Sequence, residues 1–409
     1  MERRTIQSTD TIYNIIEAYP ETREIFIANG FPQLTDDAQL ARIGKMLTFK
    51  AAMQAKKKNP EIFMTLLEEI IEQKHIMAEE GISTYETEGS CTVAGILPCP
   101  IKIPLIDQFT RFEKEYGRTM GKSINYRLQS ASGGLGWLED EIREVEELKD
   151  LPDLIISAGF ELFFDPTLYG KHRDQNAFED LSALPQFNSC FDGLDLKDTQ
   201  NNYSIVGGVP AIFLVDTLEL HGRKAPETWD DLLSEEFTGS ISLPVEDFDL
   251  FNAVCLTLYK NRGIEAIKAL GRNMLGSMHP AQMVKNKKDE IKPAVTVLPW
   301  FFTRMVFPGT SLQVVWPKDG SILSPIFLAS KQEKREELAP IVEFFESEEV
   351  GVVMRDKGFF PSVNPAVDNG ISSEQPFQWL GWDFIYSHDI AGLIKECTET
   401  FNASQGAVK

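Results

Sequence analysis

Residues 207–217 read GGVPAIFLVDT, an apolar run with the length and composition of a buried strand. No helical pattern matches this strand, although strands of an α/β sheet usually have a helix of their own. We therefore interpret the run as a crossover strand. The stretch 317–330, PKDGSILSPIFLAS, is the candidate for the return crossover.

Upstream of this run, strands and helices alternate. Apolar strand candidates lie at 93–97, 123–129 and 153–157, and LIDQFTRFEKEYG, residues 105–117, is predicted to be a helix. This alternation is typical of βαβ units and a parallel sheet, and so it predicts an α/β fold. Ligands of such sheets bind at the carboxyl ends of the strands. We therefore expect a ligand site at the loops PCP, SASGG and SAGF, which follow the three strands.

The second loop lies in QSASGGLGW, residues 129–137. A dinucleotide-binding G-x-G-x-x-G is excluded because Glu139 stands where the third glycine would be. A phosphate-binding P-loop is also excluded, since the nearest match, at Gly121-Lys122-Ser123, has the wrong spacing and precedes a strand. Two interpretations remain: the loop binds an anion at the start of a helix, or Ser132 only caps that helix.

The chain is acidic, with 62 acidic and 40 basic residues and a formal net charge of −22. This balance argues against nucleic acid or an anionic membrane surface as the main partner. No segment approaches the ~20 apolar residues that span a bilayer, and we expect no membrane insertion. The five cysteines form no C-x-x-C pair, and the histidines and cysteines do not have the spacing of a zinc site. We therefore predict no metal and no cofactor.

The N-terminus, MERRTIQSTDTIYNII, lacks the apolar run of a secretory signal. An odd number of cysteines also fits a reducing compartment better than a disulfide framework. We expect a cytoplasmic protein, and a periplasmic or cell-envelope location is the alternative if a leader is missing.

The first 80 residues differ in pattern from the rest. A long helix is predicted over 36–57, and a further helical pattern ends at Gly81. We interpret residues 1–80 as a small all-α domain and the polar stretch 81–92 as a linker.

Three further places could carry chemistry. Cys99 stands between two prolines at a strand end, as a ligand contact, a nucleophile or a small buried hydrophobe. Glu246 and Asp247 end a later strand, where they face a cleft or lie in a solvated turn. Trp300 follows another strand, as an aromatic wall or as part of the core.

Several segments resemble one family in their order and spacing. FTRFEKEYG (109–117) matches a helix that ends in glycine, and APETWDDLLSEEFTGSISLP (225–244) matches the pattern P-x-T-W-x-D-L…G-x-I. FFESEEVGVVMRDKGFFPSVNP (344–365) matches a C-terminal piece. Together with the glycine loop and the crossovers, residues 92–400 resemble the type II solute-binding proteins of ABC transporters. The likeness is to the branch for ferric iron, sulfate and polyamines.

The resemblance implies two α/β lobes, joined by two crossover strands, that close on a ligand. The first lobe would comprise residues 93–206 and 321–409, with the C-terminal helices, and the second lobe residues 207–320. An adjacent tyrosine pair often ligates iron in this family, but Trp300-Phe301-Phe302 stands in the comparable region, which argues against iron. The expected ligand contacts are Cys99, Ser130, Ser132, Gly133, Gly134, Phe160, Asp247 and Trp300.

The segment DTIYNIIEAYPETREIFIANGF (10–31) resembles a small helical domain of unknown function that precedes some intracellular redox and iron-centre repair proteins. Those relatives often carry a cysteine after the Gly-Phe pair, whereas Pro32 follows here, so we do not expect this domain to bind a metal. A binding-protein fold joined to such a module implies a sensor, carrier or scavenger. Its N-terminal helices would dock an intracellular protein, and an ABC permease is the alternative partner.

We therefore predict a non-catalytic protein that closes around a small polar or anionic ligand. One alternative is an enzyme, since thiamine-degrading enzymes resemble these binding proteins. Cys99 as nucleophile with Glu246 or Asp247 as base would be the matching pair. A third hypothesis is an interaction protein whose cleft is vestigial.

Overall fold

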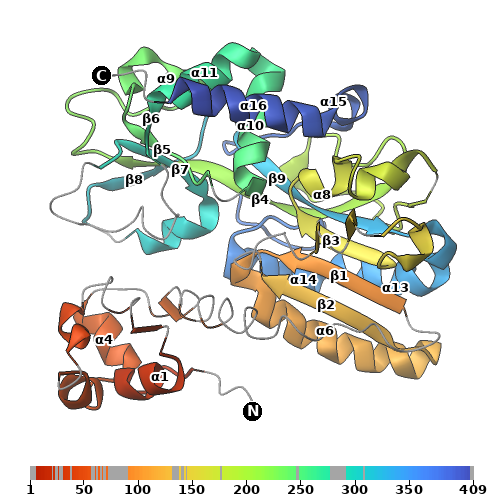
Figure 1. Cartoon of the computed structure of the whole chain (residues 1–409), viewed down its shortest axis with the longest axis horizontal. Coiled ribbons are helices and arrows are strands. Elements are labelled where there is room, and N and C mark those ends of the chain that lie inside the picture. Colours follow the sequence, from red (N-terminus) through yellow and green to blue (C-terminus); the bar gives the residue numbers. More distant parts are fainter. Residues whose placement is uncertain are drawn as a thin grey trace. The chain divides into compact units, whose positions relative to one another are not determined.

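The computed structural model divides into two compact units (Figure 1), the first formed mainly by residues 1–84 and the second by most of residues 85–409. The structure describes residues 6–20, 22–23, 26, 31–36, 39–56, 60, 63–64, 67, 71, 91–130, 138–139, 142–143, 145–175, 177–245, 248–276, 292–306 and 309–405. The predicted linker lies almost wholly outside this set, so the domain boundaries stay a prediction.

The first unit is built from short helices around a core of its own. Its helical segments are α1 (Ile12–Ala18), η1 (Pro32–Thr35), η2 (Leu40–Gly44) and α4 (Phe49–Ala55). Phe26, Phe49 and Phe63 pack together in this core, with ring centroids 5.3 Å and 5.9 Å apart. The expected all-α character of the described part is confirmed.

The single long helix predicted over 36–57 is wrong. The chain leaves the helical path at residues 45–48, and Thr48 then begins α4 by accepting a hydrogen bond from the amide of Ala51. Thr48 also bridges to Thr11, which caps α1 in the same way. Threonine favours this capping position, so two helices form where one apolar stripe predicted a single helix.

The second unit is organised on one mixed sheet of ten strands. Along the sheet the strands run in the order β2-β1-β3-β9-β4-β7-β5-β6, with β10 beside β9 and β8 beside β4. The strands are β1 (Cys91–Leu97), β2 (Ile124–Ser130), β3 (Leu154–Ala158), β4 (Tyr203–Asp216), β5 (Ile241–Ser242), β6 (Met274–Gly276), β7 (Val295–Pro299), β8 (Leu312–Val315), β9 (Ser321–Ser330) and β10 (Phe377–Gln378).

Two long antiparallel strands, β4 and β9, join the two halves of this sheet. The first half of β4 pairs with β9, from Tyr203↔Ala329 to Ala211↔Ile322, and its second half pairs with β7. The far end of β9 pairs with β3. Every residue of both strands is buried, as the uninterrupted apolar runs predicted. Both predicted crossovers are thus confirmed.

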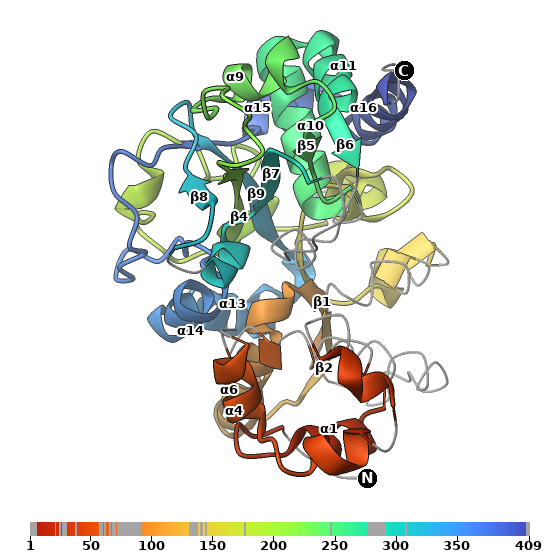
Figure 2. The same cartoon turned by 90° about the vertical axis from the view of Figure 1, so that its left-hand side faces the viewer.

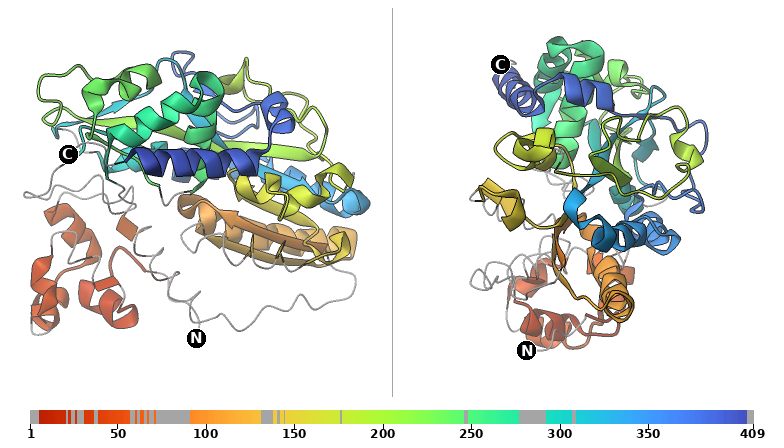
Figure 3. Two further views of the ribbon diagram at one scale, coloured as in Figure 1. Left: turned by 45° about the horizontal axis from the view of Figure 1, so that its top comes forward. Right: turned by 90° about the vertical axis from the view of Figure 1, so that its right-hand side faces the viewer.

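Helices cover both lobes, and α16 contacts α8, which follows β3, as well as α10 and α11. Lobe 1 holds β1, β2, β3 and α6, against which α13 and α14 pack, and lobe 2 holds β5, β6 and β7 with α10 and α11. The C-terminal helix α16 lies along α10 and α11 (Figure 3). The helices of this unit are α6 (Cys99–Met120), α8 (Glu161–Phe164), α9 (Trp229–Leu233), α10 (Phe248–Arg262), α11 (Ile264–Asn273), α13 (Arg335–Phe345), α14 (Glu348–Val353), α15 (Trp382–Ser387) and α16 (Ile390–Ser404).

Shorter helical turns link these elements, and two of them bear on the site. These turns are η4 (Leu148–Asp150), η5 (Tyr169–Gln175), η6 (Ser189–Phe191), η7 (Glu235–Phe237), η8 (Trp300–Met305), η9 (Gln332–Lys334) and η10 (Met354–Gly358). Turn η8 follows β7 in lobe 2, and η10 packs against α6 in lobe 1. The second unit is therefore a two-lobed α/β fold with two crossover strands, as predicted.

Candidate ligand-binding site at the lobe junction

The carboxyl ends of the first three strands lie at one edge of lobe 1. Strand β1 runs parallel to β3, with Val93 opposite Leu154. Strand β2 is the other neighbour of β1, and the amide of Cys91 donates to the carbonyl of Ser123 (3.2 Å), so these two strands begin side by side. The three loops that follow therefore leave the sheet at the same edge, where parallel sheets bind ligands.

Two of the predicted contacts lie at element ends and several lie outside the described residues. Cys99 is the first residue of α6, and Ser130 is the last residue of β2. Ser132, Gly133, Gly134, Glu246 and Asp247 lie outside the described residues. Their contact with a ligand stays a prediction.

Helix α6 begins directly after β1 at this edge. Pro98, which precedes it, makes no side-chain cap, and Pro100 fits the first turn because its missing N–H has no intrahelical partner there. The amides of a first helical turn carry partial positive charge and attract anions. The start of α6 therefore favours negative charge near the loop ends.

Lys102 adds a full positive charge to that first turn. Its side chain is 5% exposed, and Lys102 and Lys331 are the buried lysines in the part of the chain that the structure describes. Burying an ammonium group is costly unless it is paired, and Lys102 has interactions of its own within the protein. Lys102 was not among the residues expected from the sequence. A lysine within the apolar run PCPIKIPLI was the available signal.

The loop after β3 touches lobe 2. Gly159 has a φ of 84°, and its amide donates to the carbonyl of Pro325 in β9 (3.0 Å). A Cβ atom at Gly159 would lie 2.4 Å from Oδ1 of Asp249, in the first turn of α10. Only glycine fits here, because other residues seldom adopt this φ and because their Cβ atom would clash with Asp249. The third loop of lobe 1 and the start of α10 are therefore in van der Waals contact.

Phe160 was expected to face the ligand, but its side chain is 1% exposed. Its ring packs against Phe327 of β9, with centroids 5.7 Å apart. Its burial favours a core role, and a contact with a ligand stays an untested prediction. A contact from this loop would come more readily from the backbone of Gly159.

Trp300 begins η8 directly after β7 and is half-buried. Its ring lies 5.3 Å from that of Trp316 and 4.8 Å from that of Phe359. Pro299, the preceding residue, pairs with Ala211 where β4 enters lobe 2. Trp300 is thus an aromatic side chain beside the crossover strands, with Phe359 as a neighbour that the sequence analysis missed.

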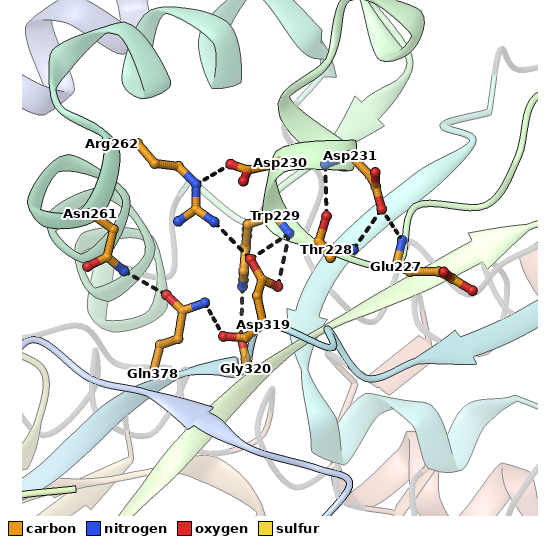
Figure 4. Close-up of polar contacts among 10 residues, drawn as sticks. All are labelled: Glu227, Thr228, Trp229, Asp230, Asp231, Asn261, Arg262, Asp319, Gly320 and Gln378. Carbon is orange, nitrogen blue, oxygen red and sulfur yellow. Dashed lines mark hydrogen bonds and ion pairs between the residues drawn. The ribbon is translucent and has the colours of Figure 1, made fainter. Parts of the chain in front are cut away.

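A second polar cluster, around the P-x-T-W motif, is part of the scaffold (Figure 4). Thr228 and Asp231 form a capping box at the start of α9. The indole N–H of Trp229 donates to the carbonyl of Gly320 (2.9 Å), and the Trp229 amide donates to the carboxylate of Asp319 (3.1 Å).

Neighbouring side chains close this cluster. Arg262, at the end of α10, binds Asp319 (2.8 Å) and also pairs with Asp230. Asn261 donates to Gln378 of β10 (2.7 Å), and Gln378 donates to the carbonyl of Asp319. The motif with the most specific resemblance therefore fastens α9 to the turn before β9, and its polar atoms bind one another.

The described thiols are poor nucleophiles. Burial raises the pKa of Cys91 to about 12, and burial also raises the pKa of Cys190 to about 11. The pKa of Cys255, which is fully buried, is raised well above its usual value. These residues therefore stay as thiols near neutral pH.

The described residues contain no group of three or more His, Cys, Asp or Glu side chains that could hold a metal ion. None of their helices combines the length and the apolar content needed to cross a membrane.

Sequence comparison with family models decides the class of the protein. The model for bacterial extracellular solute-binding proteins matches residues 149–388, more than half of the chain. The chain belongs to this family. A second model, a domain of unknown function (DUF1858), matches residues 6–64, in the separate N-terminal unit. No curated protein matches the chain.

Solved structures of periplasmic binding proteins share the fold. The ferric binding protein from Campylobacter jejuni is 13% identical, with a TM-score of 0.52, and covers 77% of this chain and 99% of its own. Iron-bound HitA from Pseudomonas aeruginosa is 13% identical, with a TM-score of 0.54, covering 76% and 99%. AfuA from Actinobacillus pleuropneumoniae, with fructose-6-phosphate bound, is 15% identical, with a TM-score of 0.51, covering 77% and 99%.

These matches are to binding proteins rather than enzymes. Solute binding of the ABC-transporter type is therefore the function of the family to which this chain belongs. The thiaminase-like alternative gains no support from them, and its two proposed bases lie outside the described residues.

Proposed function

We propose that this protein binds a small anionic solute at the junction of its two lobes. The observation that carries the proposal is the edge of lobe 1 where the carboxyl ends of β1, β2 and β3 meet and α6 begins, with Lys102 in the first turn of that helix. The helix amides and the ammonium group favour the same sign of charge there. The net charge of −22 makes this local positive site unusual for the chain.

The geometry of the crossovers supports a binding mode by lobe movement. The two lobes are joined by β4 and β9, and they touch through Gly159 and Asp249 on lobe faces that both adjoin these strands. A ligand held by α6 of lobe 1 and by lobe 2 would favour the conformation in which both lobes contact it. Such a protein would report ligand through its conformation.

Among the solved structures above, AfuA carries a phosphorylated sugar and HitA carries iron. A phosphorylated or carboxylated metabolite fits an ammonium group and helix amides. We therefore place the ligand of this protein among small organic or inorganic oxyanions.

The free cysteines and the separate N-terminal unit support a proposal about the cellular role. The four cysteines Cys91, Cys190, Cys255 and Cys397 are free, which suits a reducing compartment. We propose an intracellular binder or sensor whose N-terminal unit docks a partner protein, and a receptor for an ABC permease is the alternative. Purification from cells with a tag on this chain, followed by identification of a stoichiometric permease or soluble partner, distinguishes the two roles.

A thermal-shift screen tests the ligand class. Inorganic phosphate, fructose 6-phosphate and citrate are the anionic probes, and neutral fructose is the matched uncharged probe. A ligand at 100 times its Kd adds about 2.7 kcal/mol of stability, so a bound anion raises the Tm by several degrees. The proposal fails if no anion raises the Tm of the folded protein.

Substitution of Lys102 tests the assignment of the charge. Lys102→Met should abolish the shift caused by the anion, because the alkyl length stays and the charge goes. Lys114→Met, at an exposed position further along α6, is the control and should bind as the wild type does. An unchanged shift in Lys102→Met would assign the anion to other groups.

A further inference from the structure

One aromatic side chain bridges the lobes beside the crossover strands. The ring of Phe359 lies 4.8 Å from that of Trp300, and the guanidinium group of Arg304 stands 4.1 Å from the centre of the same ring. Arg304 also donates to the backbone carbonyl of Asp356. Phe359 is therefore held between an indole and a cation, both of which come from η8.

The partners of this contact belong to different lobes. Trp300 and Arg304 follow β7 of lobe 2. Phe359 follows η10, and a Cβ atom at the preceding Gly358 would lie 2.9 Å from Ile101 of α6, in lobe 1. Figure 2 shows α6 and α11 in the two lobes on either side of the crossover strands.

The contact also lies close to the crossover strand β4. The segment after Phe359 runs beside β4, where the amide of Gly208 donates to the carbonyl of Pro361 (3.2 Å) and Gly207 bridges to Ser362. The pairing of β4 with β9 shifts register between Ile205 and Gly207. A register shift bends a strand locally, so the aromatic contact lies beside a place where rotation of the lobes can bend β4.

The backbone at Phe359 is strained. Its φ is 53°, a left-handed conformation that bulky side chains seldom adopt. Its amide donates to the carbonyl of Arg355 (3.1 Å), which ends the helical turn η10 in the way that glycine or asparagine usually does. A phenylalanine at a position suited to glycine indicates that the ring is needed. Strain of this kind is found at ligand clamps and switches.

We infer that Phe359 is a latch, which holds the two lobes together through Trp300 and Arg304. The inference rests on the proposed function in one respect, that the lobes separate to admit a ligand. A movement that separates η8 from η10 breaks the contact between Phe359 and Trp300, and Trp300 is itself a predicted ligand contact. The latch therefore adds to the cost of separating the lobes, beside the contact between Gly159 and Asp249.

Distances between spin labels test the latch without any ligand. Ketone-bearing amino acids at Lys114 of α6 and Lys268 of α11, both exposed, carry the labels and leave the native cysteines in place. Phe359→Asn removes the ring and keeps a residue that accepts the left-handed backbone. Arg304→Gln removes the cation. Arg355→Gln is the control, because Arg355 pairs with Asp356 within η10 (2.7 Å).

The latch predicts a larger long-distance population in both test variants and a wild-type distribution in Arg355→Gln. Loss of one cation–π contact corresponds to about a 2- to 30-fold rise in the ratio of open to closed protein. Equal distributions in wild type, Phe359→Asn and Arg304→Gln would overturn the latch. Arg304→Gln, at a half-buried surface position, keeps the test valid if Phe359→Asn does not fold.

The result is separable from ligand binding. A shift in distances with no Tm response of the wild type to any anion would retain the latch and reject the proposed ligand class. A Tm response to an anion, with distances that none of the substitutions changes, would retain the proposed ligand class and reject the latch.

Discussion

Glu346 gives the sharpest prediction about stability. This residue follows α13, its side chain is 2% exposed, and its Oε1 has no hydrogen-bond partner among the described residues. The pKa of its carboxyl group is raised to about 7, mainly by burial and to a smaller extent by the carboxylate of Asp180. A hydrogen bond from Ser182 lowers this pKa and so opposes part of the rise. Asp180 itself is paired with Lys197 (2.6 Å), whose charge lowers the pKa of Glu346.

The magnitude follows from the shift of the pKa. The ordinary value is 4.5 and the folded value is about 7, so the folded protein retains a proton that the unfolded chain has lost between these pH values. At about 1.4 kcal/mol for each unit of pKa, ionisation of Glu346 costs the folded state about 3 kcal/mol. Stability should fall as pH rises from 4.5 to 7 and then level off at higher pH.

Glu346→Gln should remove this part of the pH dependence, because glutamine has the shape of the protonated acid and does not ionise. Urea unfolding at pH 5, 6, 7 and 8, followed by tryptophan fluorescence, gives the unfolding free energy of each protein. We expect the variant to gain on the wild type as pH rises, by about 3 kcal/mol at pH 8. Glu343→Gln, an exposed position on α13, should follow the wild type. Parallel curves for wild type and Glu346→Gln would refute the reasoning.

Three further substitutions have distinct expected results. Asp153→Asn leaves the buried ammonium of Lys331, now 3.1 Å from a carboxylate oxygen, without its counter-charge, and should cost about 3–5 kcal/mol in urea unfolding; a loss below 1 kcal/mol would mean that the carbonyls of Leu151 and Lys149 satisfy Lys331. Gly159→Ala should lower the Tm more than Gly309→Ala, since both glycines have a φ of 84° but an added Cβ meets Asp249 only at Gly159; equal losses would show that the lobes can separate there without cost. Trp229→Phe removes the hydrogen bond to Gly320 and should cost about 1 kcal/mol or more, because the carbonyl left behind is buried; an unchanged unfolding free energy would contradict a scaffold role for the cluster.

The sequence predicted those parts of the fold that depend on long apolar runs. Strands β4 and β9 are buried along their whole length, so no polar residue interrupts their pattern and both were recognisable. The strand that was predicted to end at Glu246 and Asp247 was too long, since only Ile241–Ser242 pair as β5 and α10 begins at Phe248. Turn and helix residues follow the short pairing directly, and an apolar pattern does not show where pairing stops.

The candidate site was harder to predict, because the burial and the backbone conformation of its residues depend on elements far along the chain. Strand ends could be located, and so the meeting of three loops at one edge of lobe 1 was expected, whereas binding of a ligand there stays a prediction. The burial of Lys102 depends on elements far along the chain, and the left-handed backbone of Phe359 depends on the end of η10 and on the ring contacts with η8. Neither property has a local signature in the sequence. Phe160, by contrast, lies directly after β3, in a loop at the expected edge, but its side chain is buried in the core.

The pairing of β3 with β9 has a consequence for how this protein is made. Ala158 pairs with Ile326, which lies about 170 residues further along the chain. A ribosome that adds about 5–20 residues per second needs about 10–30 s to reach β9 after it has finished β3. During that time the apolar edge of β3 has no neighbour on that side, and exposed strand edges are templates for aggregation. We expect nascent chains that stop between residues 160 and 320 to depend on chaperones, and full-length chains to be released from them once β9 has been inserted.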